Sequence, residues 1–324
     1  MAATFPPIVD SVEQRRRRDA RHDRWFRRLL MGCALLVLAA LLGAALATFW
    51  GGREVLIGQG LDFLTSSAWN PVEDDYGAWA PIYGTLVTSL IAIAIAVPVS
   101  FGIALFLTEI APRWLRGPIG TAIELLAGIP SIIYGMWGLF VLVPFMAEYV
   151  DPWLNDHIGT WPLIGVLFSG PPLGLGTLTA GIVLAIMIIP FIAAVMRDVF
   201  RTVPTRLKES AYALGSTTWE VVWHIVLPYT RQAVVGGIFL GLGRALGETM
   251  AVTFVLGNSF DIHASLLMPG TTISSAIANE FNEAVGTHRA ALMALGFLLF
   301  VVTFIVLLVA RLMLRSMERR EGKA

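Results

Sequence analysis

Arg244 and Glu248 place two full charges inside the stretch GLGRALGETMAV, residues 241–252, which belongs to a run apolar enough to span a bilayer. Charged groups at membrane depth are costly, so they are expected to face a bundle interior or an aqueous path. If the run is one helix, the two side chains lie one turn apart on one face. Two interpretations follow: an ion pair within the helix that holds it to its neighbours, or a pair that handles a substrate.

The chemistry of the two groups favours an oxyanion. An arginine fork offers paired donors that match the oxygens of a tetrahedral anion. A glutamate beside it would repel fully ionised sulfate, yet it can accept a hydrogen bond from the P–OH group that phosphate keeps near neutral pH. Thr249 is assigned to the same path, as are Ser131 and Tyr134, although helix packing explains these last two hydroxyls equally well.

The composition is that of an integral membrane protein. Of the 324 residues 56% are hydrophobic and only 14% are charged, and the mean hydropathy is +0.72. Six apolar segments are long enough to cross a bilayer as helices: residues 29–50, 82–107, 119–146, 176–196, 232–256 and 290–310. We therefore expect an all-α, polytopic fold with six transmembrane helices.

The basic residues predict the orientation. With six crossings, all of the 23 basic residues except Arg53, Arg244 and Arg289 fall on the side of the N-terminus, and basic loops stay inside. Both termini are thus expected in the cytoplasm. The expected parts are a basic tail (1–28), a first helix (29–50), an outer loop (51–80), a bundle (81–315) that contains an inner loop (197–231), and a C-terminal tail (316–324).

The first apolar segment has a second interpretation. A basic start before an apolar run resembles a secretory signal, and Ala45-Leu46-Ala47 offers a cleavage triplet. The apolar stretch is longer than the usual core of such a signal, so a retained helix is preferred. The single cysteine, Cys33, lies in this segment, which excludes a disulfide within the chain.

The inner loop, residues 197–231, contains residues that are typical of helix starts and helix ends. Pro204 suits a helix start, and Gly215 suits a left-handed helix end. Thr217 and Glu220 have the spacing of a capping box, which opens a second helix that we expect to close at Pro228. Two short helices joined by a glycine turn would form a rigid surface for a partner.

Residues 209–228, ESAYALGSTTWEVVWHIVLP, resemble the EAA loop of permease subunits of ATP-binding cassette importers. The pattern falls on Glu209, Ser210 in place of an alanine, Ala211, Gly215, Ile225, Leu227 and Pro228. The resemblance implies that residues 209–218 form a coupling helix seated on an ATP-hydrolysing subunit. There is no phosphate-binding GxxxxGK[ST] loop in the chain, so we expect no enzyme activity, no bound cofactor, and ATP with Mg²⁺ used by the partner.

Three further stretches, IPSIIYGMWGLFVLVP at 129–144, MIIPFIAAVMRDVFRTVP at 187–204 and GRALGETMAV at 243–252, resemble permeases of the bacterial phosphate-specific importers. The likeness covers residues 60–315 and implies a type I, MetI-like permease bundle in the plasma membrane. It also implies a PstA-like sister permease, two PstB-like ATP-binding subunits and an extracytoplasmic PstS-like phosphate-binding protein. In such permeases the arginine and glutamate of the fifth helix, here Arg244 and Glu248, belong to the phosphate path.

Alternatives remain. The chain could carry another oxyanion, such as sulfate, molybdate or phosphonate, or act as a phosphate-sensing scaffold for a sensor kinase. Glu109 and Glu124 are interpreted as helix-end charges. The five histidines show no ligand spacing, so no metal site is expected. The arginine run at residues 15–18 is expected to meet lipid headgroups rather than nucleic acid.

Overall fold

The chain forms two units, residues 1–50 and 51–324. The computed structural model describes residues 8–321, with side chains from 22 to 316. Helix α1 spans Ile8–Gly58, so that its last turns belong to the second unit. Its apolar stretch is hydrophobic all round, which is typical of a helix surrounded by lipid.

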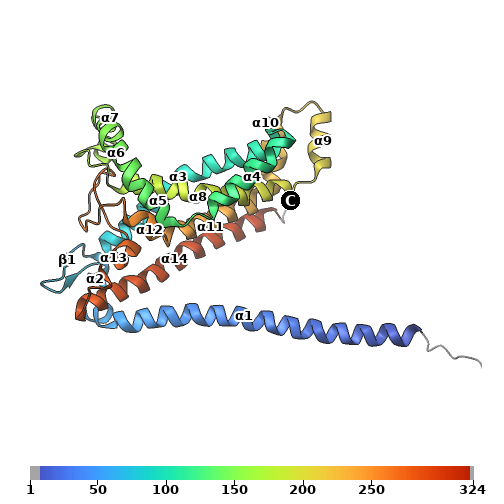
Figure 1. Cartoon of the computed structure of the whole chain (residues 1–324), viewed down its shortest axis with the longest axis horizontal. Helices are drawn as coiled ribbons and strands as arrows, with labels where there is room; N and C mark the ends of the chain where they lie inside the picture. The colour runs from blue at the N-terminus through green and yellow to red at the C-terminus, as the bar shows by residue number, and fades with distance from the viewer. Residues whose placement is uncertain (1–7, 322–324) are drawn as a thin grey trace, which may run out of the picture. The chain divides into compact units, whose positions relative to one another are not determined.

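Nearly all of the regular structure in the second unit is helical (Figure 1). In chain order its elements are α2 (Leu61–Thr65), β1 (Trp69–Asn70), β2 (Asp75–Tyr76), α3 (Trp79–Leu105), α4 (Arg113–Ala127), α5 (Ser131–Trp137), α6 (Val143–Phe145), α7 (Asp151–His157), α8 (Thr177–Arg201), α9 (Thr205–Ala213), α10 (Thr218–Val221), α11 (Leu227–Leu246), α12 (Met250–Thr253), α13 (Ile273–Glu280) and α14 (Gly286–Glu321). A 3₁₀ turn covers Gly165–Phe168, and π-helical turns cover Phe106–Ile110, Gly138–Leu142, Met146–Val150 and Val222–Val226.

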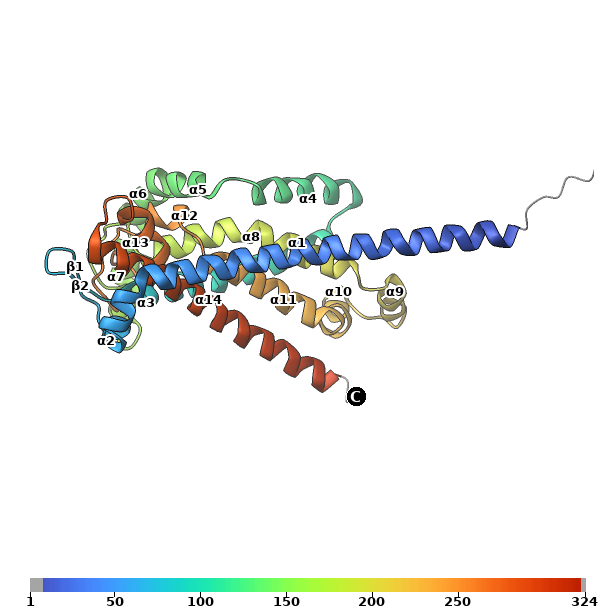
Figure 2. The ribbon, with the colours of Figure 1, turned by 90° about the horizontal axis from the view of Figure 1, so that it is seen from below.

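These π-helical turns join neighbouring α-helical stretches into longer helices. Within the described residues six helices are long and apolar enough to cross a membrane: His22–Gly58, Trp79–Ile110, Ser131–His157, Thr177–Arg201, Thr218–Leu246 and Gly286–Ser316. The expected number of spans is therefore confirmed. Figure 2 shows α3, α8, α11 and α14 running between the end of the unit that carries the β-hairpin and the end that carries α9.

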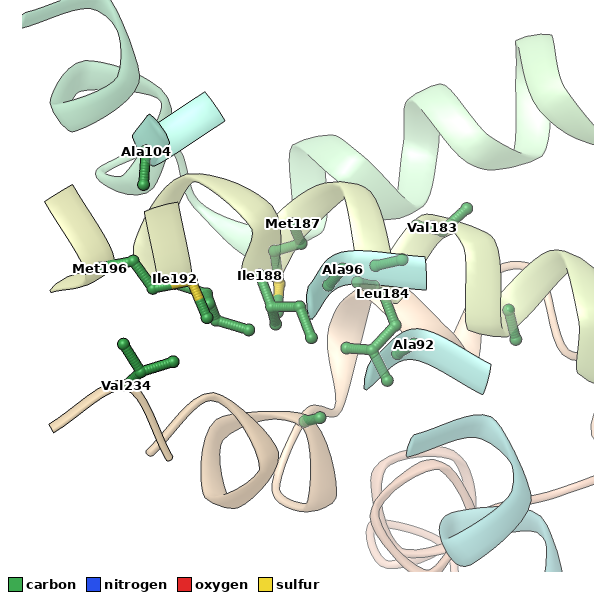
Figure 3. Packing of buried hydrophobic residues seen from close by; sticks show 14 of the residues in the cluster. Ala92, Ala96, Ala104, Val183, Leu184, Met187, Ile188, Ile192, Met196 and Val234 are labelled. Atoms are coloured by element: carbon green, nitrogen blue, oxygen red, sulfur yellow. The ribbon is translucent and has the colours of Figure 1, made fainter. Parts of the chain in front are cut away.

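Helix α8 lies at the centre of the second unit, with α3, α4 and α11 packed around it. Small side chains on α3, such as Ala92 and Ala96, let its backbone approach α8 closely, which is how helices associate in membranes. Figure 3 shows these two alanines beside Leu184 and Ile188 of α8. The Ser100 hydroxyl of α3 also donates a hydrogen bond to the backbone oxygen of Ile189, at 3.0 Å.

At the hairpin end, residues 51–80 form a cap on α13 and α14. Val55 and Phe63 are buried in a cluster with Ile273 and the first turns of α14. The Trp69 ring stacks on Phe260, with 4.4 Å between ring centroids. Aromatic packing on an apolar cluster holds this loop in a defined shape.

One carboxylate ties the cap together. Glu280 Oε2, at the end of α13, accepts a hydrogen bond from Trp69 Nε1 at 2.8 Å. It also lies 2.8 Å from His288 Nε2 of α14. The hairpin, α13 and α14 are thus joined at a single polar point inside the aromatic cluster.

Two expected spans had the wrong bounds. The segment 119–146 is not one helix, because α4 ends at Ala127 and α5 begins at Ser131, as Figure 2 shows. Pro130 precedes α5 in an extended conformation that no helix continues through. The segment 232–256 is also broken, at residues 247–249. Hydropathy measures apolar length, and it does not register a break inside an apolar run.

The expectation that a helix closes at Pro228 was wrong as well. The helix that begins at Thr218 continues through a π-helical turn, Val222–Val226, into α11. Pro228 comes directly after this π-helical turn; a proline inside a helix has no N–H to donate, so a local departure from α-helical geometry is expected there. The fifth span therefore reaches back to the capping box.

Candidate functional site

Arg244 and Glu248 do not lie on one helix. α11 ends at Leu246 with Gly247 as its cap, and Glu248 lies in the following turn. Its carboxylate Oε1 accepts a long hydrogen bond, 3.4 Å, from the backbone nitrogen of Ala251 in α12. Glycine is a poor helix former, and a carboxylate at a helix start is favourable, so both residues favour the break. The intrahelical ion pair is therefore not formed.

Arg244 occupies the last turn of α11, where a cation meets the negative end of the helix dipole. Its guanidinium carbon lies 5.9 Å from the centroid of the Phe191 ring of α8. The side chain is exposed. Among the described residues no carboxylate forms an ion pair with it. Its charge is available to an incoming anion.

The break between α4 and α5 lies at mid-height of α8. Gly120 of α4 lies against the guanidinium of Arg197, near one end of α8. Gly138, beyond α5, lies against Val183 in the other half of α8. The residues halfway between the two glycines, 128–130, therefore face the middle of α8.

The second break lies at the same height. Phe191, which contacts Arg244, is near the middle of the 25-residue helix α8 and follows Pro190. The break at 247–249 begins three residues after Arg244. Two interrupted helices and one arginine thus meet at mid-length of a bilayer-spanning helix. Non-helical backbone at such a depth is tolerated where protein or a water-filled cavity surrounds it.

The helices that follow the two breaks are in direct contact. α5 packs on α12, and Gly135 of α5 lies against the backbone of Met250 and Ala251. The Tyr134 hydroxyl donates a hydrogen bond to the backbone oxygen of Leu126 at 2.9 Å, across the break between α4 and α5. The absence of a side chain at Gly135 is what permits this approach.

The predicted path residues fall around this contact. Ser131 is the first residue of α5, and its side chain is partly buried. Thr249 precedes α12, and its hydroxyl lies 3.5 Å from the backbone oxygen of Gly247. The structure places Ser131 and Tyr134 in the first turn of α5, and Glu248 and Thr249 directly before α12, which packs on α5. Arg244 lies one turn before Glu248. Phe191 was missed, because nothing in its sequence context separates it from other core aromatics.

The other predicted site is the two-helix element at the α9 end. α9 begins after Pro204, and Gly215 has a φ of +90°, as expected for the turn. The Thr217 hydroxyl accepts a hydrogen bond from the Glu220 nitrogen, while the Glu220 carboxylate accepts one from the Thr217 nitrogen. The start of α9, the glycine turn and the capping box are thereby confirmed.

The predicted coupling residues divide by burial. Glu209, Ser210, Gly215 and Pro228 are exposed, whereas Ala211, Ile225 and Leu227 are partly buried. Ala211 and Ile225 pack against the main core cluster. Beside them the element shows apolar side chains to solvent, and Leu214 is 88% exposed. One face of the two-helix element therefore packs against the bundle, and the opposite face is exposed to solvent.

Two ion pairs near this element were not foreseen. Glu109 and Glu124, interpreted as helix-end charges, each pair with a distant base. Glu109 Oε1 lies 2.6 Å from Lys208 Nζ of α9, and Glu124 Oε1 lies 2.6 Å from Arg197 Nη2 of α8. The partners are 99 and 73 residues apart in the chain, so no local pattern connects them.

Broken helices around a mid-height arginine, in a bundle of bilayer-spanning helices, are the features of a membrane transport permease. The profile of the family described as "Binding-protein-dependent transport system inner membrane component" matches residues 96–319. This chain belongs to that family. It is accordingly a multi-pass membrane permease and not a catalytic ATPase.

Relatives and solved structures agree with this assignment. The "Phosphate transport system permease protein PstC" of Xylella fastidiosa (strain 9a5c) is 69% identical over 305 residues, 94% of this chain and 94% of that protein. A chain of the crystal structure of a bacterial alginate ABC transporter has a TM-score of 0.62 at 18% identity and covers 93% of this chain and 97% of its own length. A chain of the MetNI methionine ABC transporter has a TM-score of 0.51 at 17% identity. The match covers 74% of this chain and 94% of the transporter chain. The expected importer-permease fold is confirmed.

Proposed function

We propose that this chain is the permease subunit of an ATP-driven importer that carries phosphate across a bacterial plasma membrane. The observation that carries the proposal is Arg244. Its guanidinium lies at the level of two helix breaks, over Phe191, and has no ion-paired carboxylate among the described residues. The names of the relatives support phosphate as the anion.

The site chemistry fits a tetrahedral oxyanion. The guanidinium fork of Arg244 binds two oxygens at once, and its contact with an aromatic ring leaves the N–H edge open. A charge-assisted hydrogen bond of this kind is roughly twice as strong as a neutral one. The anion is held briefly and released when the bundle changes shape.

Glu248 supplies selectivity in this proposal. Because it forms no ion pair with Arg244, its carboxylate does not neutralise the arginine beforehand. Glu248 Oε1 accepts the hydrogen bond from the Ala251 nitrogen. The other carboxylate oxygen, Oε2, is able to accept a hydrogen bond from a P–OH group. Sulfate carries no such proton near neutral pH, so the carboxylate repels it. The site therefore distinguishes phosphate from fully ionised oxyanions.

The α9 end faces the cytoplasm and docks on the ATP-hydrolysing subunit. Basic residues at this end, among them Arg201, Arg206 and Lys208, support this orientation. The exposed Leu214 and Tyr212 give α9 an apolar contact surface, of the kind that marks a protein interface. ATP and Mg²⁺ act in that subunit, of which there are two.

The remaining partners lie in and outside the membrane. A sister permease completes the translocation path, because one bundle supplies only part of its wall. An extracytoplasmic phosphate-binding protein delivers the anion to the hairpin end, where residues 51–80 form the cap. Both termini lie in the cytoplasm.

The proposal is tested by uptake of labelled phosphate in cells that lack this chain and retain the partner subunits. Wild type should restore uptake that excess unlabelled sulfate does not reduce. Arg244→Gln should reach the membrane in normal amount and take up much less phosphate than wild type at low phosphate concentration. Gly215→Pro should fail to restore uptake, because it destroys the turn at the docking element.

Arg289→Gln is the matched control. Arg289 also lies over a phenylalanine ring, 5.1 Å from the centroid of Phe281, but at the hairpin end. Its loss should leave uptake unchanged. If wild type restores no phosphate uptake, or if sulfate competes fully, phosphate is the wrong substrate. If Arg244→Gln transports as well as Arg289→Gln, the arginine is not on the path.

A further inference from the structure

One ion pair joins the docking element to the body of the bundle. The Lys208 ammonium of α9 lies 2.6 Å from the Glu109 carboxylate, which follows α3 in the chain. The two side chains are only 15% and 7% exposed. Exposed ion pairs form easily and contribute little, whereas this one is shielded from water on both sides.

Lys208 is on the anchored face of α9. Arg206, Leu207, Glu209 and Ser210 around it are exposed, and only Lys208 and, one turn later, Ala211 point toward the bundle. Ala211 makes an apolar contact, which resists separation but allows sliding. The ion pair is the directional contact between α9 and the long helices.

Glu109 is held firmly on its side. It lies in the π-helical turn Phe106–Ile110 that extends α3, and its neighbour Leu107 is fully buried. The turn is closed by a hydrogen bond from the Ala111 nitrogen to the Phe106 oxygen, at 2.7 Å. π-helical turns inside longer helices are frequently found at functional sites.

From Glu109 the contact leads to the proposed anion site. α3 packs along α8 and α11, and Ile93 of α3 lies against Gly241 of α11. Gly241 is one turn before Arg244 on the same helix. α3 is thus in direct contact with the helix that carries the arginine.

We propose that the Lys208–Glu109 ion pair is the link by which a movement of α9 is transmitted to α3 and onward to the turn that carries Arg244. Separating the pair would leave two charges in a poorly hydrated place, which is strongly unfavourable. Pulling or pushing α9 therefore moves α3 rather than breaking the contact. The inference rests on the proposed function, because it assigns a role in energy coupling to residues outside the anion path.

The test uses the complete complex with its ATP-hydrolysing subunits in proteoliposomes. Phosphate accumulated per ATP hydrolysed is measured for wild type, Lys208→Met, Glu109→Gln and the charge-swapped double variant K208E/E109K. We expect about a tenfold lower ratio in each single variant, within the range known for residues that carry coupling. The swapped variant should recover most of the wild-type ratio.

Arg201→Gln is the control for loss of a charge at the same end. Arg201 is 53% exposed and lies 3.9 Å from Asp198, so this surface pair should leave the ratio unchanged. A wild-type ratio in Lys208→Met overturns the inference. The inference is also overturned if a single variant of the pair assembles poorly but keeps the wild-type ratio of phosphate to ATP, because the ion pair would then only stabilise the fold. A swapped variant no better than the single ones also counts against it.

A second measurement does not depend on phosphate. In a Cys33→Ser background, spin labels at the exposed Thr205 of α9, outside the predicted docking segment, and at the exposed Leu90 of α3 report one distance. This distance should stay constant on ATP binding in wild type and change in Lys208→Met. A change in wild type overturns the link. If the label distance behaves as expected in both proteins but wild type transports no phosphate, the assignment of phosphate as the substrate is wrong. The proposed link between α9 and α3 is then still supported.

Discussion

The guanidinium of Arg244 lies over the ring of Phe191, 5.9 Å from its centroid, at the height where two neighbouring helices are interrupted. This relationship orients a cation toward polar backbone in the middle of an apolar bundle. The contact with the ring is weak, of the order of 1 kcal/mol. It directs the side chain without neutralising it.

The planar fork of Arg244 should matter as much as its charge. Arg244→Gln is expected to raise the KM for phosphate uptake by about 10- to 100-fold, which corresponds to the loss of hydrogen bonds to a charged group worth about 1.5–3 kcal/mol. Arg244→Lys keeps the charge and loses the planar fork, so its KM should lie between that of wild type and that of Arg244→Gln. Initial rates over a range of phosphate concentrations give these values. A wild-type KM in the lysine variant would show that a point charge suffices.

The contact between α5 and α12 should not tolerate a side chain at Gly135. A Cβ atom there would lie 2.8 Å from the backbone oxygen of Met250. Gly135→Ala should therefore destabilise the protein by about 1–3 kcal/mol, as overpacking does, and lower the uptake rate. Thermal unfolding of the purified protein in detergent measures the first effect.

Gly102→Ala, in α3, is the matched control. A Cβ at this position meets no atom within 4 Å, and alanine is the better helix former by about 1 kcal/mol. This variant should be as stable as wild type or more stable, with normal uptake. Equal loss of stability in both variants would show that the α5–α12 contact is not tight.

The turn after α9 should respond in a graded way at Gly215. The residue has a φ of +90° and is exposed, and no atom lies within 4 Å of an added Cβ. Substitution therefore acts through the backbone alone, at about 1–2 kcal/mol for a residue with a Cβ atom. Uptake should fall in the order glycine, asparagine, alanine, proline, because asparagine adopts this conformation most readily of the three substitutes. An alanine variant better than asparagine would contradict the turn geometry.

Stability at high pH should depend on Tyr76 in the cap. Burial, followed by the charge of Asp74 and the hydrogen bond to it, raises the pKa of the Tyr76 hydroxyl above 10.0. The folded state thus holds the proton more tightly than the unfolded state. The stabilisation is present below pH 10 and is lost as the pH rises through the folded pKa. The unfolding temperature of wild type should fall over this range.

Tyr76→Phe provides the comparison, because it keeps the ring that stacks on His288. Its unfolding temperature should depend less on pH above 10 than that of wild type. Parallel curves for the two proteins would mean that the hydroxyl titrates alike in the folded and unfolded states.

Local rules accounted for much of the fold. Apolar length predicted the six spans, because a bilayer sets the minimum length of a crossing helix. The capping box at Thr217 and Glu220 and the turn at Gly215 were predicted correctly, since both depend on residues within a few positions. Helix continuity was not predictable in the same way. Gly247 interrupts α11, and the single face expected for Arg244 and Glu248 does not exist.

By itself the sequence determined that this is a six-span membrane protein with a structured loop at one end, because hydropathy, capping and turn formation act over short distances. Only the tertiary structure decided what meets across the bundle. Small residues let α3 and α8 approach closely, and that packing brings Arg244 over Phe191 and Lys208 to Glu109. Such contacts join residues far apart in the chain, and their partners follow from how the helices pack.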